Sequence, residues 1–90
     1  MSFKLWATYT DDGGSVSTVS ERTAETLSGA RATLAAMLRE ESLDSVHEPF
    51  VVEAAIRSAW AWDGKGTFSC RLQAWNLVPN RTLRVWGKVG

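Results

Sequence analysis

The alternation of apolar and polar residues near the start of the chain predicts a hairpin of two strands. Over residues 3–9, apolar side chains occupy every second position, which is typical of a strand with two unlike faces. Residues 11–14 contain two adjacent glycines, which adopt the positive φ angles of a tight turn at little cost. Residues 15–19 are then expected to return as an edge strand.

The periodicity changes near residue 22, and residues 22–41 are expected to form one amphipathic helix. Apolar side chains recur there every three to four positions, in a segment rich in alanine and free of proline. They form a single stripe: Leu27, Ala30, Leu34, Met37 and Leu38. Thr18 and Glu21 have the spacing of a capping box, whereas Ser20 and Thr23 are alternative caps, so the sequence leaves the helix start open.

The second half is expected to form a three-stranded meander. Residues 50–62 alternate in polarity and lead directly into a glycine-containing turn at residues 63–66, which favours a strand. A helix over the same residues is the rival interpretation, because Pro49 suits a first helical position. Residues 67–78 and 82–89 alternate more clearly, with a turn between them.

These elements predict a single α+β domain spanning residues 1–90, in the order β-β-α-β-β-β, with an antiparallel sheet. One helix covers only one face of a sheet, so the other face is expected to remain open to solvent. The alternation of side chains along the strands assigns a basic and aromatic set to that open face. The binding residues predicted there are Trp6, Arg57, Arg71, Gln73, Trp75, Arg84, Trp86 and Lys88, and Lys4 and Glu53 share their parity.

Tryptophan content and charge distinguish this expected face from an ordinary polar surface. The chain has five tryptophans in 90 residues, and its ten basic and ten acidic residues cancel. The charges are nevertheless segregated: residues 1–56 carry four basic and nine acidic side chains, whereas residues 57–90 carry six and one. Trp and Arg dominate interface hot spots and also stack on bases, so the functional interpretation is a binding surface. The structural alternative is packing of each Trp over its cross-strand neighbours.

Candidate catalytic chemistry is sparse. His47 is the only histidine, and nearby carboxylates in the same expected loop make neither a convincing triad nor a metal site. Cys70 is the only cysteine and falls on the apolar parity of a strand, so it is expected to be a buried, inert thiol. We therefore expect no enzyme activity, no cofactor and no metal.

The expected location is the cytoplasm, without membrane contact. No apolar run approaches the ~18 residues of a membrane span, and the first residues lack the apolar block of a signal peptide. A single cysteine also fits a reducing compartment.

The predicted layout, rather than any motif, resembles a known group of proteins. A chain of 90 residues with a hairpin, one long helix and a three-stranded meander is similar to several small anti-CRISPR proteins encoded by phages. This resemblance covers nearly the whole chain. It implies an inhibitor that evades host defence by binding protein subunits of a CRISPR–Cas complex in the bacterial cytoplasm and occluding guide or target. It assigns no functional residue.

The sequence therefore leaves two alternative functions from different classes. The first is a phage or mobile-element protein that acts by protein–protein interaction, as a monomer or homodimer, through the Trp/Arg sheet face, the acidic side of the helix, or both. The alternative is a small module that binds single-stranded nucleic acid, with tryptophans stacking on bases and basic side chains contacting phosphates.

Overall fold

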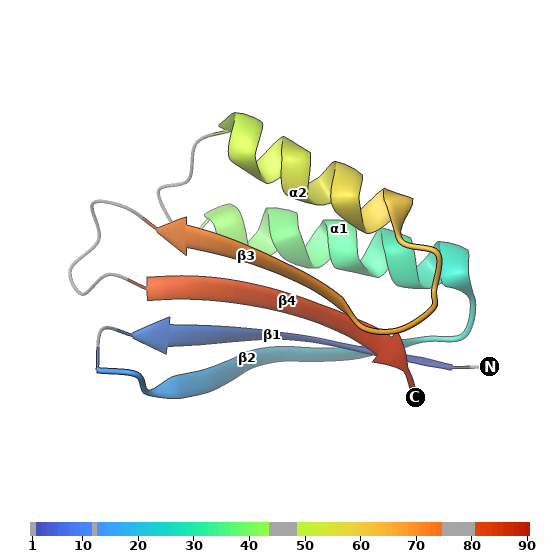
Figure 1. Cartoon of the computed structure of the whole chain (residues 1–90), viewed down its shortest axis with the longest axis horizontal. Coiled ribbons are helices and arrows are strands. Elements are labelled where there is room, and N and C mark those ends of the chain that lie inside the picture. The colour runs from blue at the N-terminus through green and yellow to red at the C-terminus, as the bar shows by residue number, and fades with distance from the viewer. Residues whose placement is uncertain (1, 12, 44–48, 75–80) are drawn as a thin grey trace.

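Two helices lie on one face of a four-stranded antiparallel sheet in the computed structural model of the chain (Figure 1). The structure describes residues 2–11, 13–43, 49–74 and 81–90. In chain order the elements are β1 (Phe3–Asp11), β2 (Val16–Ala24), α1 (Leu27–Leu43), α2 (Pro49–Ala61), β3 (Phe68–Ala74) and β4 (Arg81–Val89). The strand order is β2-β1-β4-β3, so the first and last strands form the centre of the sheet. The predicted α+β class and antiparallel sheet are confirmed.

The strand predicted over residues 50–62 is wrong, because this segment forms helix α2. The order of elements is therefore β-β-α-α-β-β rather than β-β-α-β-β-β. The buried positions of α2 are Ala55, Ile56 and Ala59, and this spacing follows one side of a helix rather than one parity of a strand. Pro49 opens the helix at a position where the missing N–H leaves no hydrogen bond unmade.

The boundary between β2 and α1 also differs from the prediction. β2 continues to Ala24, and α1 begins at Leu27 rather than near residue 22. Thr26 caps the helix, since its side-chain oxygen accepts a hydrogen bond from the backbone N–H of Gly29 at 3.0 Å. All the candidate caps named from the sequence lie within β2 instead. The predicted helix stripe is otherwise buried, except for the half-buried Leu27.

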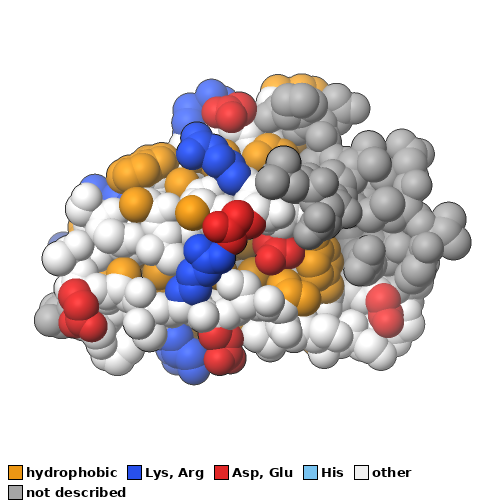
Figure 2. All heavy atoms as spheres, turned by 180° about the vertical axis from the view of Figure 1, so that it is seen from behind, with side chains coloured by type: hydrophobic (Ala, Val, Ile, Leu, Met, Phe, Trp, Pro, Cys, Tyr) orange, Lys and Arg blue, Asp and Glu red, His pale blue; other side chains and the backbone are white. Residues whose placement is uncertain are grey.

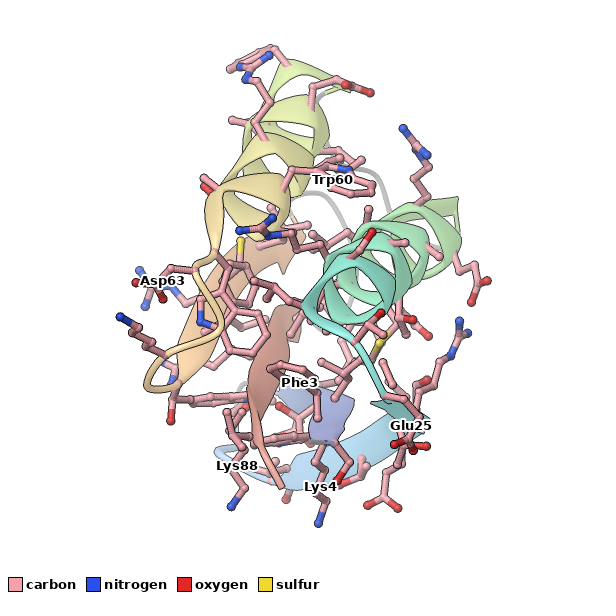
Figure 3. The ribbon with its side chains drawn as sticks, turned by 90° about the vertical axis from the view of Figure 1, so that its right-hand side faces the viewer. Phe3, Lys4, Glu25, Trp60, Asp63 and Lys88 are labelled. Carbon is pink, nitrogen blue, oxygen red and sulfur yellow. The ribbon has the colours of Figure 1, made fainter. Side chains whose placement is uncertain are left out.

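The core lies between the helices and the facing side of the sheet. The sheet contributes Phe3, Leu5, Ala7, Phe68, Leu72, Leu83 and Val85, and the helices contribute Ala30, Leu34, Ala35, Met37, Leu38, Ala55, Ile56 and Ala59. Figure 3 shows Phe3 pointing from β1 toward the helices.

Trp62, the residue after α2, closes one end of this core. Its ring meets Phe3 edge-on at a centroid distance of 5.7 Å and lies 6.0 Å from the ring of Phe68. Gly87 makes room for it, because a Cβ there would lie 3.2 Å from the indole. The Trp62 indole N–H donates to the carbonyl of Lys65 at 3.2 Å. Trp62 is therefore a structural residue.

Candidate binding surface on the open sheet face

The face of the sheet away from the helices carries most of the side chains that the strand parity assigned to it. Across the central pair of strands, Lys4 lies opposite Lys88 and Trp6 opposite Trp86. Lys4 and Lys88 both point away from the helices (Figure 3). On the neighbouring strand β3, Arg71 lies opposite Arg84. The open-face cluster comprises Lys4, Trp6, Arg71, Arg84, Trp86 and Lys88.

Two stacked tryptophans form the centre of the open-face cluster. The ring centroids of Trp6 and Trp86 are 5.9 Å apart, and the ring planes differ by 6°. The register accounts for this stack, because directly opposite residues on adjacent strands hold their Cβ atoms roughly 5 Å apart. Sequence segments at opposite ends of the chain thus build one aromatic unit.

A cation lies over each of the two rings. The guanidinium carbon of Arg84 is 5.6 Å from the ring centroid of Trp86, and the ammonium of Lys88 is 5.9 Å from that of Trp6. Both distances lie within the range of cation–π attraction. Each ring therefore contacts the other ring and one cation, and both tryptophans are half-buried while Lys88 remains exposed.

The described part of this face has a basic excess. Its four basic side chains, those of the open-face cluster, stand against one acidic residue, Glu21 of β2, which lies opposite Trp6. On the side of the molecule seen in Figure 2, by contrast, basic and acidic side chains lie next to one another. Elsewhere in the described part of the chain, Arg22 of β2 forms an ion pair with Glu40 of α1.

The indole N–H of Trp86 is the one unsatisfied side-chain group found among the described residues of this face. It is buried and has no hydrogen-bond acceptor among the described groups. A buried donor without a partner costs about 1–3 kcal/mol.

One predicted site residue, Arg57, lies in the helical layer rather than on the sheet. Arg57 belongs to α2, so its assignment to the sheet face is wrong, as is the parity that placed Glu53 there. The error follows directly from treating residues 50–62 as a strand.

The two remaining predicted site residues are Gln73 and Trp75. Gln73 belongs to β3 and lies opposite Thr82 in the register. Trp75 lies outside the described residues, as do His47 and its acidic neighbours.

Sequence reasoning also missed two exposed aromatic residues. Phe50 and Trp60, both on α2, are 70% and 48% exposed. Their spacing of ten residues places them on one side of a helix, but that relation becomes visible only once the segment is treated as helical.

Cys70 lies on the side of the sheet that faces the helices, opposite Val85, as the alternation predicts. Its side chain is half-buried, and burial raises the pKa of the thiol because desolvation disfavours the thiolate. The reactive form is therefore scarce at neutral pH.

No feature of a small-molecule or metal site stands out in the described part of the chain. A depression of about 430 Å³ at one end of the sheet is bounded by Ser2, Phe3, Lys4, Glu21, Arg22, Thr23 and Gly90. Lys4, Glu21 and Arg22 line it together with Phe3, and it is an open depression, whereas a typical ligand pocket encloses most of its ligand. Among the described residues, no three His, Cys, Asp or Glu side chains gather closely enough to hold a metal ion. None of the described helices has the length and apolar character to cross a bilayer.

Comparisons of the chain with protein-family models, with curated proteins and with solved structures gave no significant match. Function therefore rests on the geometry of the open-face cluster.

Proposed function

We propose that this protein works by binding an acidic surface of another protein through its open-face cluster. The observation that carries the proposal is the stacked pair of Trp6 and Trp86, with a cation over each ring, at the centre of a sheet face that no element of the described chain covers. Trp and Arg are the residues that most often contribute large shares of interface energy. A basic surface with a rigid aromatic centre suits a flat partner that carries carboxylates.

The contacts of the two rings favour a protein over single-stranded nucleic acid. Recognition of single strands by stacking needs an aromatic ring with a face free for a base. Each ring here already contacts the other ring and a cation, so a base would have to displace Arg84 or Lys88. A carboxylate can instead bind the outward N–H groups of the cations where they stand.

Binding of single-stranded nucleic acid is the second candidate, and the charge of the face supports it. Four basic residues against one acidic residue could neutralise several phosphates, and such binding weakens steeply with added salt.

The proposed target is a subunit of a bacterial CRISPR–Cas complex, with the protein acting as an occluding inhibitor from a phage or mobile element in the host cytoplasm. The resemblance of the predicted layout supports this target class. The hairpin and the long helix of that layout are present, whereas α2 takes the place of one strand of the expected meander.

A phage-plating assay tests both the surface and the target class. On cells whose active CRISPR–Cas system targets the phage, the phage should form plaques again when the cells express the wild-type protein. Trp86→Ala and Arg84→Glu should abolish this rescue, because truncating an interface anchor or reversing a central charge typically costs ~2 kcal/mol or more of binding. Lys65→Glu is the matched control, since it makes the same charge change as Arg84→Glu at an exposed position between α2 and β3, outside the open-face cluster.

The outcomes separate the parts of the proposal. No rescue by wild type in strains of any CRISPR–Cas type would contradict the target class. Rescue by wild type and by both open-face variants alike would contradict the surface. Fluorescence polarisation with a labelled single-stranded oligonucleotide at low salt tests nucleic-acid binding, the second candidate function. That function requires that the wild-type protein binds the oligonucleotide and that Arg84→Glu weakens this binding.

A further inference from the structure

Helix α2 exposes two large aromatic side chains that the packing of the domain does not explain. Phe50 is 70% exposed and Trp60 is 48% exposed, whereas the side of α2 that packs in the core buries Ala55, Ile56 and Ala59. Figure 3 shows Trp60 on the flank of α2 that faces α1, away from the sheet. Large aromatic side chains are enriched at protein–protein interfaces, which makes this side of α2 a candidate contact surface.

Two charged residues lie between these aromatics on the same flank. Phe50, Glu53, Arg57 and Trp60 follow one another at intervals of three, four and three residues, which aligns them along one side of a helix. All four side chains are exposed. Neither Glu53 nor Arg57 forms an ion pair with another residue in the described part of the chain. We name these four residues the α2 stripe.

Two copies of the α2 stripe are complementary to one another when their helices run antiparallel. Phe50 and Trp60 lie about 15 Å apart along the axis, and Glu53 and Arg57 lie about 6 Å apart, at a rise of 1.5 Å per residue. Both pairs are centred on the same point, at residue 55. Two antiparallel α2 helices related by a twofold axis at that point therefore bring Phe50 against the partner's Trp60 and Glu53 against the partner's Arg57.

We propose that a second copy of this chain docks on the α2 stripe, with the two α2 helices antiparallel. Twofold symmetry makes each contact twice, giving two aromatic contacts and two opposite-charge contacts from four residues per copy. A parallel arrangement would place Glu53 against Glu53 and Arg57 against Arg57, so charge selects the antiparallel one. The open-face cluster lies on the other side of the sheet and stays free in this dimer (Figure 1).

The size of the interface predicts a dimer that depends on concentration. A stable complex usually buries about 1,600 Å² in total, and one helix from each copy supplies less than that. Analytical ultracentrifugation of the wild-type chain should therefore show a mass rising from 9.9 kDa toward twice that value as the concentration increases into the millimolar range.

Charge exchange tests the proposed register directly. Glu53→Arg and Arg57→Glu should each weaken self-association at least about tenfold, because each places like charges opposite one another at two contacts. The double variant should self-associate like wild type, since the two exchanged charges would again lie opposite their complements. An equimolar mixture of the two single variants should form a heterodimer, because one stripe is then wholly basic and the other wholly acidic.

Arg71→Glu on the open face is the matched control, and it should dimerise like wild type. All variants should keep the helical circular dichroism of wild type, since the changed side chains are exposed. A wild-type chain that stays monomeric throughout the concentration range would overturn the proposal. Single variants that dimerise like wild type, or a double variant as weak as the singles, would overturn it equally.

Discussion

The pairing of Trp6 with Trp86 shows how one position in the register decides what a side chain can do. The two residues lie opposite one another on the central strands, and each also has a cation of β4 over its ring. The sequence alone left open whether these tryptophans pack across the strands or bind a partner. The structure shows that the rings of Trp6 and Trp86 stack on one another. Both rings are only half-buried, which leaves room for a binding role as well.

A double-mutant cycle on Trp6 and Trp86 measures how much the stack contributes to folding. The coupling free energy from Trp6→Leu, Trp86→Leu and the double variant should be about 0.5–1.5 kcal/mol in favour of the native state, as for other aromatic pairs. Urea unfolding followed by circular dichroism provides the four stabilities. A coupling indistinguishable from zero would show that the rings do not stabilise one another in solution.

At the scale of the elements, β1, β3 and β4 were easier to predict than α2, because the two faces of each of these strands meet different surroundings. β1, β3 and β4 each face the core on one side and solvent on the other, so the alternation appears in the sequence. Residues 50–62 contain many apolar side chains, and Phe50 and Trp60 stay exposed, so periods of 2 and 3.6 fit almost equally well. This ambiguity also affected the predicted site. Arg57 lies in this segment and was therefore assigned to the sheet by mistake, whereas Trp6, Arg71, Arg84, Trp86 and Lys88 do lie on strands.

The start of α1 gives a prediction of its own, because several residues could have capped it. Thr26→Ala should destabilise the protein by about 1 kcal/mol, since it removes the acceptor for the N–H of Gly29. Thr23→Ala is the matched control: it removes the same hydroxyl from an exposed position on β2, three residues earlier, and should cost less. Thermal unfolding of both variants decides the point, and a larger loss for Thr23→Ala would place the helix start earlier.

At the scale of the whole molecule, a net charge of zero conceals one basic face. The described open face carries four basic residues and one acidic residue. The helices, in their described side chains, balance three basic residues against three acidic ones, namely Arg31, Arg39 and Arg57 against Glu40, Glu41 and Glu53. A partner approaching the sheet therefore meets a positive field that the total charge does not reveal.

This asymmetry makes the rate of partner binding depend on salt. The association rate constant for an acidic partner should fall roughly tenfold as ionic strength rises from low to physiological values, because screening shortens the range of attraction from about 30 Å to about 8 Å. Stopped-flow measurements on the double variant Arg71→Glu with Arg84→Glu should show a much shallower dependence. The Arg57→Glu variant should keep the wild-type dependence, since its charge lies on α2 and its effect belongs to self-association. A rate constant that does not change with salt, or a slope that Arg57→Glu lowers as much as the sheet variants do, would show that the basic sheet face does not guide the encounter.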